Sequence, residues 1–119
     1  MKDLQDDEYC LFINGGEGSD LWALLADWSD SEDEEEWKKH IPRFSRLIRC
    51  WQRLGFIKVF QSDEWPAHLT SEAVTGQALD DLLADPASWE YQDPDRWTCV
   101  GSGDRDIHEL EEGTCDRER

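Results

Sequence analysis

Apolar side chains recur at helical spacing in the middle of the chain. Across residues 43–54 they fall at the i, i+3, i+4 and i+7 positions that predict a helix with one buried face, and Gly55 suits its C-terminus. Residues 56–61 are mostly apolar and predict a partly buried strand. The predicted buried face of the helix consists of Phe44, Leu47, Ile48, Trp51 and Leu54.

The chain before this helix predicts two further helices. Ser19 or Asp20 can cap the first, and residues 33–39 predict the second because acidic side chains interact well with a helix N-terminus. Pro42 suits the first turn of the next helix, although the two could also run on as one bent helix. The buried face of the first helix is predicted to hold Leu21, Leu24, Leu25 and Trp28.

Shorter elements are predicted on both sides. Residues 9–13 predict a short strand or an extended arm, and the glycine-rich residues 14–18 predict a flexible turn. Residues 71–84 predict a helix whose regular part begins near Thr75, and residues 97–100 predict a second strand. Three short helices followed by two strands predict an α+β fold, a helix-rich winged-helix-like domain with a small antiparallel β-hairpin or sheet.

The length of 119 residues is that of one domain. We expect a flexible acidic N-terminus over residues 1–8, a single globular domain over 9–101, and a polar, partly disordered C-terminal tail over 102–119. Within the tail, Ile107 and Leu110 are expected to dock a last turn, and residues 113–119 are expected to be loose.

The charge of the chain is distributed unevenly. Residues 38–58 hold seven of the twelve basic residues and no Asp or Glu, so this segment carries +7. The remainder holds five basic and 29 acidic residues, which gives −24 and a net charge of −17. A surface this acidic repels nucleic acid and attracts cationic proteins.

Cysteine, histidine and tryptophan define further expectations. The four cysteines and three histidines are dispersed without zinc-ligand spacing, so we expect free thiols and no metal.

The N-terminus lacks the pattern of a secretory signal, which favours a cytoplasmic location. The seven tryptophans are expected to build much of the core, with Trp65 and Trp89 as candidate loop-borne partner anchors.

Two stretches carry a resemblance. RLIRCWQRLGFIKVF has the arginine-rich helix, Leu-Gly and strand found in many winged-helix domains. LTSEAVTGQALDDLLADPASWEY, with the later DRWTCV, resembles small acidic winged-helix-like actinobacterial proteins of immunity or uncharacterised type, often found beside toxins. The resemblance covers residues 20–101, and its motifs are structural and not catalytic.

Charge, fold pattern and missing chemistry together predict an acidic inhibitor, an immunity-type antitoxin that occludes the cationic site of a toxin or nuclease. Inhibitors of this kind need steering and complementarity but no catalytic residue, and we expect neither enzymatic activity nor a cofactor. Its basic protein partner is predicted to contact Asp30, Glu32, Asp33, Glu34, Glu35, Glu36, Asp63, Glu64, Trp65, Asp80, Asp81, Asp85, Trp89, Asp93 and Asp95.

Two alternatives remain. A phage-type nucleic-acid mimic that blocks a host defence nuclease would use the same acidic surface. A winged-helix DNA-binding regulator would instead use Arg43, Arg46, Arg49 and Arg53 of the predicted helix. The acidic residues 29–36 and the other acidic segments are expected to neutralise these arginines, which favours protein binding over DNA binding.

Overall fold

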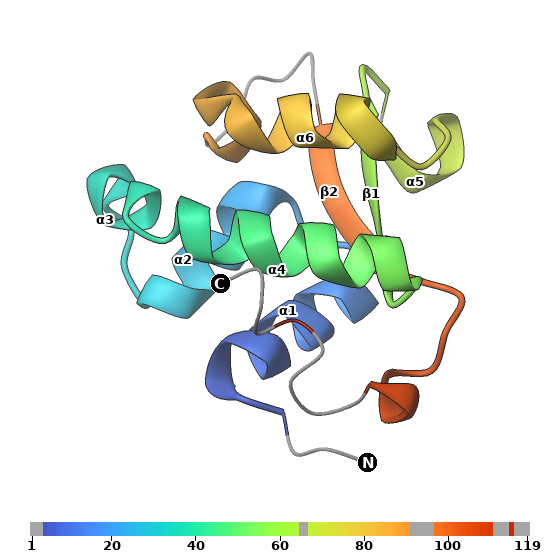
Figure 1. Ribbon diagram of the computed structural model, residues 1–119. Coiled ribbons are helices and arrows are strands. Elements are labelled where there is room, and N and C mark those ends of the chain that lie inside the picture. Colours follow the sequence, from blue (N-terminus) through green and yellow to red (C-terminus); the bar gives the residue numbers. More distant parts are fainter. Residues whose placement is uncertain (1–3, 65–66, 91–96, 111–114, 116–119) are drawn as a thin grey trace.

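In the computed structural model, residues 4–64, 67–90, 97–110 and 115 are described, with nothing said of the side chains of His68 and Thr70. Helices dominate, and they surround one pair of strands (Figure 1). The elements in chain order are α1 (Asp6–Glu17), α2 (Leu21–Ser29), α3 (Glu34–Lys38), α4 (Ile41–Leu54), β1 (Ile57–Ser62), α5 (Ala67–Thr70), α6 (Gly76–Ala84), the 3₁₀ turn η1 (Pro86–Trp89), β2 (Trp97–Ser102) and the 3₁₀ turn η2 (Ile107–Glu109).

The two strands form an antiparallel sheet. Val59 pairs with Val100, and the register runs from Ile57 opposite Ser102 to Ser62 opposite Trp97. An isolated bridge between Asp20 and Cys99 joins the start of α2 to the sheet. The predicted α+β class with a small antiparallel sheet is therefore confirmed. The winged-helix assignment stays a prediction, and the described part of the chain has four helices before β1 where three were predicted.

Helix α4 forms as the sequence predicts. Pro42 lies in its first turn, and Gly55 ends it with a φ of 90°, a left-handed conformation that glycine adopts without a Cβ clash. Its buried residues come from the predicted apolar face and also include Cys50, while Leu54 is only partly buried. In Figure 1, α4 crosses the front of the molecule between α1 below and α6 above.

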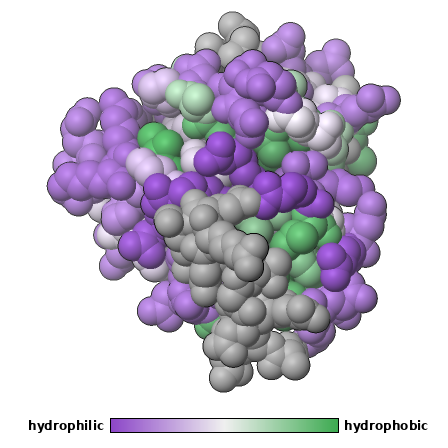
Figure 2. Space-filling model, in the orientation of Figure 1, coloured by the Kyte–Doolittle hydropathy of each residue, from purple (hydrophilic) through white to green (hydrophobic). Residues whose placement is uncertain are grey.

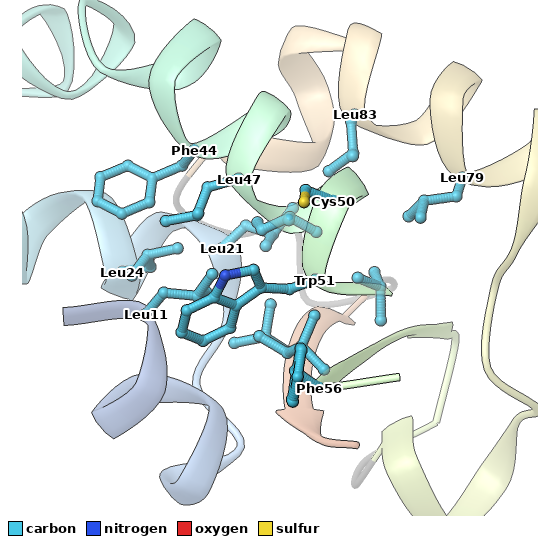
Figure 3. Close-up of a cluster of buried hydrophobic side chains, with 14 of the residues drawn as sticks. Leu11, Leu21, Leu24, Phe44, Leu47, Cys50, Trp51, Phe56, Leu79 and Leu83 are labelled. Carbon is cyan, nitrogen blue, oxygen red and sulfur yellow. The ribbon is translucent and has the colours of Figure 1, made fainter. Parts of the chain in front are cut away.

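The core gathers on the inner face of α4. Figure 3 shows Phe44, Leu47 and Trp51 of α4 facing side chains from α1, α2 and α6. Trp51 is 1% exposed and packs edge-to-face against Phe56 at a ring-centroid distance of 6.3 Å. None of the helices in the described part of the chain, α4 included, is long and apolar enough to cross a membrane.

The N-terminal region differs from the prediction. Residues 9–13 lie within helix α1 and not in a strand, and the helix begins at Asp6, inside the segment expected to be flexible. The backbone N–H of Gln5 donates to Glu8 Oε1 over 2.9 Å, which closes the first turn. Asp7 and Glu8 are buried although both are acids, so the polarity of this segment misled the prediction.

The expectation of free thiols is wrong for two of the four cysteines. Cys50 of α4 and Cys115 form a disulfide across 65 residues, while Cys10 and Cys99 are free thiols. Spacing alone gave no sign of the bond, because its two ends meet only through the tertiary fold. Cys115 is 4% exposed, so the expectation of a loose segment is wrong at this residue.

The chain after β2 is held against the end of α4. The backbone N–H of Gly103 donates to the Phe56 carbonyl over 3.0 Å, and a Cβ at Gly103 would clash with the carbonyl oxygen of Gly55. Arg105 Nη1 donates to the Leu54 carbonyl, which supplies a partner for the end of α4. Leu110 is buried at 2% exposure, so the predicted docking of this region is confirmed.

Candidate functional site

The strongest concentration of charge is the loop and short helix between α2 and α4. We call Asp30, Glu32, Asp33, Glu34, Glu35 and Glu36 the acidic cluster. They end α2, form the turn after it and open α3, and all except the partly buried Glu36 are exposed. In Figure 2 this end of the molecule is covered by hydrophilic residues.

Hydrogen bonds hold the turn in one conformation. The Asp33 carboxylate, at the N-cap of α3, accepts from the Glu35 amide over 2.9 Å. Ser31 Oγ accepts from the Asp33 amide over 3.0 Å. Asp30 ends α2 with a φ of 52°, a left-handed conformation that Asp and Asn tolerate better than most residues. The cluster is thus presented on an ordered turn.

Trp37 anchors the cluster to the core. Its ring is 5% exposed and stacks on Trp22 of α2, with centroids 5.9 Å apart and planes at 26°. Its indole N–H donates to the Ser31 carbonyl over 2.7 Å. One buried side chain therefore fastens α3 to α2 and the intervening loop to both.

Only part of the cluster's charge is compensated. Glu35 pairs with Lys38 at 3.4 Å and Glu36 with Lys39 at 2.8 Å, both within α3 or its cap. The hydrogen bond and charge of Glu36 raise the pKa of Lys39. Among the described residues, no basic side chain lies within 4 Å of the other cluster members.

The remaining predicted contact acids lie on other elements. Asp80 of α6 lies 3.9 Å from Arg49, and Asp81 accepts from Gln77 over 2.8 Å. Asp85 accepts from the Ala87 amide and so caps η1. Asp63 and Glu64 are exposed just after β1. These acids lie on α6, at the start of η1 and just after β1, whereas the acidic cluster lies between α2 and α4.

One of the two predicted anchors is wrong. Trp89 is 2% exposed, and its indole N–H donates to the Leu83 carbonyl over 3.0 Å, so it is a core residue and not a surface anchor. Trp89 is buried because η1 packs against α2 and α6. The spacing of apolar residues along the sequence did not predict this packing. Trp65, Asp93 and Asp95 lie outside the described residues.

Two arginines of α4 pair with acids on neighbouring helices. The prediction assigned their neutralisation to residues 29–36 and to the other acidic segments. Two of the arginines meet acids of those other segments, since Arg43 lies 3.5 Å from the buried Asp7 of α1 and Arg49 pairs with Asp80 of α6. Arg43 also lies over the Trp28 ring at 5.4 Å. A phosphate backbone approaching α4 would therefore meet carboxylates on both sides of the helix.

The two free thiols, Cys10 and Cys99, both have a raised pKa. Burial, with the charge of Asp27, raises the pKa of the Cys10 thiol to about 11, and burial with the charge of Asp20 does the same for Cys99. A thiol with such a pKa is a poor nucleophile at neutral pH. Within the described residues, no group of three or more His, Cys, Asp or Glu side chains is arranged to hold a metal ion.

Comparison with known proteins gives no relative. Neither the protein-family models, nor the curated proteins, nor the solved structures contain a match to this chain.

Proposed function

We propose that this chain is an immunity-type inhibitor that binds a cationic toxin or nuclease through its acidic cluster and occludes the partner's basic site. The observation that carries the proposal is the ordered presentation of the cluster by Trp37. Like charges held close together destabilise a fold, so an ordered, incompletely paired group of six carboxylates has a cost. Binding to a complementary cationic surface is a function that offsets this cost.

The geometry favours this class over a DNA-binding regulator. The +7 segment is a core element whose arginines meet Asp7 and Asp80, while the net charge of the chain is −17. A nucleic-acid mimic would bind its partner through the same acidic surface. The identity of the bound protein, a toxin or a host defence nuclease, distinguishes the inhibitor from the mimic.

The proposal places the encounter in the cytosol, as the sequence predicts. The Cys50–Cys115 disulfide argues against this location, because disulfides are rare in a reducing cytosol. Rapid alkylation of thiols in intact cells, followed by mass spectrometry, decides whether Cys50 and Cys115 are bonded where the protein acts.

The experiment starts with capture of partners from host lysate at low salt, and the captured basic protein is then purified. Its association rate should fall steeply as salt rises, and a stoichiometric amount of inhibitor should abolish its activity. The variant Asp30→Asn/Glu32→Gln should slow association several-fold at low salt. The matched control Glu17→Gln/Glu72→Gln has the same net charge but leaves the cluster intact, and it should slow association less.

Two results would overturn the proposal. One is a purified partner whose association rate responds equally to the cluster variant and to the control. The other is a complex that forms without any effect on the partner's activity, since occlusion is the mechanism proposed.

A further inference from the structure

A second charged feature lies on the outer side of α4, near its first turn. It is a hollow of about 460 Å³. Basic side chains dominate its lining, in contrast to the acidic character of the whole chain. The residues that line it are Asp7, Lys39, His40, Pro42, Arg43 and Arg46.

Arg46 differs from the other cations of the hollow. Lys39 has Glu36 at 2.8 Å, and Arg43 has Asp7 at 3.5 Å together with the Trp28 ring. Arg46 has no ion pair or hydrogen bond to any of the described residues, and its Nε is buried. Buried polar atoms nearly always have a partner, so a guanidinium N–H in this state is an unmet donor.

Arg43 and Asp7 line the hollow together with Arg46. Arg43 and Arg46 are three residues apart on α4 and therefore share a side of the helix. Asp7 is the one acid of the lining, and it is already engaged, because Oδ1 accepts from the Glu8 amide and Oδ2 faces Arg43. Asp7 therefore offsets the charge of Arg43 but not the charge of Arg46.

His40 also lines the hollow. Its Nδ1 lies 3.3 Å from the indole nitrogen of Trp28. An indole N–H can only donate, so Nδ1 accepts and the neutral ring carries its proton on Nε2. The residues of the lining that carry N–H donors are thus one lysine, one histidine and two arginines.

We propose that this hollow binds a single oxyanion group, a carboxylate or a phosphate, with Arg46 as its main ligand and Arg43 and Lys39 in support. The planar fork of guanidinium N–H groups matches two oxygens of either group. The site is separate from the acidic cluster, and its ligand can be tested without the protein partner.

The test is a titration of the whole protein with sodium phosphate and, separately, with sodium acetate, followed by NMR of the arginine side-chain Nε–H signals. Sodium chloride at equal ionic strength is the essential control, because screening alone stabilises a chain of net charge −17. We expect a saturable shift of the Arg46 signal with at least one of the two oxyanions and none with chloride.

Variants make the assignment specific. In the Arg46 variants, which lack the Arg46 signal, binding is followed through the Nε–H signal of Arg43, which lines the same hollow. Arg46→Gln should weaken binding about tenfold, and Arg46→Lys, which keeps the charge but loses the fork, should weaken it less. Arg53→Gln is the matched control, since Arg53 lines a different hollow with Arg49 and Asp80. It should leave the response of Arg46 unchanged.

Response to phosphate alone identifies a phosphate site, and response to acetate alone identifies a carboxylate site. The proposal is overturned if neither anion exceeds the chloride control. It is also overturned if a folded Arg46→Gln protein, checked by circular dichroism, binds as tightly as the unsubstituted protein. Either result leaves the inhibitor proposal untouched, because that rests on the acidic cluster.

Discussion

The indole N–H of Trp37 donates to the main-chain carbonyl of Ser31 over 2.7 Å. The bond spans the loop that carries half of the acidic cluster and ties it to a buried ring. Without it, carboxylates that repel one another would be free to separate. The Trp37–Ser31 contact therefore links the core of the protein to the shape of its proposed binding surface.

Trp37→Phe removes this hydrogen bond and keeps most of the aromatic packing. We expect a loss of about 1–3 kcal/mol in the free energy of unfolding, because the Ser31 carbonyl loses its partner. We also expect faster hydrogen exchange at the amides of Asp33 and Glu35, whose bonds shape the turn. Urea unfolding measures the first effect and NMR-detected exchange the second.

Trp89→Phe is the matched control for that variant. It also removes a buried indole N–H from a main-chain carbonyl, that of Leu83. It should destabilise the protein by a similar amount and leave the exchange of the Asp33 and Glu35 amides unchanged at neutral pH. Equal exchange rates in both variants would mean that Trp37 does not order the cluster.

Neutralising part of the cluster should stabilise the protein. Asp30→Asn/Glu32→Gln removes two exposed carboxylates that have no ion pair to the described residues, and Asn tolerates the left-handed backbone at position 30. Relief of repulsion should raise the free energy of unfolding by about 0.5–1 kcal/mol at low salt. The gain should vanish in 1 M NaCl, where screening is strong.

Asp80→Asn provides the contrast, since Asp80 faces Arg49 at 3.9 Å. The Asp80→Asn variant should not raise the free energy of unfolding at low salt. If Asp30→Asn/Glu32→Gln is also without gain, the cluster is not under electrostatic strain, and the main support for the inhibitor proposal is lost.

Strong periodicity made some elements predictable. The apolar face of α4 and the glycine that ends it are local signals, and the structure reproduces them. Helix α1 has the opposite pattern, with Tyr9 58% exposed while Glu8 is 1% exposed. The burial of the Glu8 carboxylate is compensated by the hydrogen bond that it accepts from the Gln5 amide. A pattern of hydropathy along the sequence does not indicate such a bond.

The candidate site was predictable in composition but not in arrangement. The acidic run of residues 29–36 is plain in the sequence. Its order depends on Trp37 reaching back six residues to a main-chain carbonyl, and the partners of Arg43 and Arg49 come from α1 and α6. These are contacts between elements, which local spacing does not encode.

The disulfide should account for a large part of the stability. Closing a loop of 65 residues restricts the unfolded chain, and the chain-entropy relation gives about 4 kcal/mol for this length. Reduction, or the variant Cys50→Ala/Cys115→Ala, should lower the urea midpoint accordingly. Thiol titration of the unfolded, unreduced protein should find the two thiols of Cys10 and Cys99.

A Cys10→Ala/Cys99→Ala protein keeps the disulfide and should respond to reductant as the unsubstituted protein does. If reductant leaves the urea midpoint of both proteins unchanged, the Cys50–Cys115 bond contributes nothing to stability. A titration that finds four thiols before reduction would show that the bond is not formed.

The free thiols should make stability fall at alkaline pH. Burial is the main cause that raises the pKa of both Cys10 and Cys99 from 9.0 to about 11. The folded protein therefore holds these protons after the unfolded chain has released them. Their contribution is full below pH 9 and is lost as pH rises from 9 to 11.

Thermal unfolding between pH 8 and pH 11 measures this effect. The melting temperature of the unsubstituted protein should fall more steeply over this range than that of Cys10→Ala/Cys99→Ala. Parallel curves would contradict the prediction. In the native state at pH 8, reaction of both thiols with a disulfide reagent should also be far slower than in urea, because little thiolate is present.

Duplex DNA should not be bound at physiological salt. Arg43 and Arg49 face Asp7 and Asp80, and the acidic remainder of the chain repels phosphates. A gel-shift assay with genomic fragments at 0.15 M salt should show no complex. If a complex does form, and if Arg46→Glu/Arg49→Glu abolishes it while Glu17→Gln/Glu72→Gln does not, α4 is a recognition helix. The regulator alternative then replaces the inhibitor, because the +7 segment would be the functional surface rather than a part of the core.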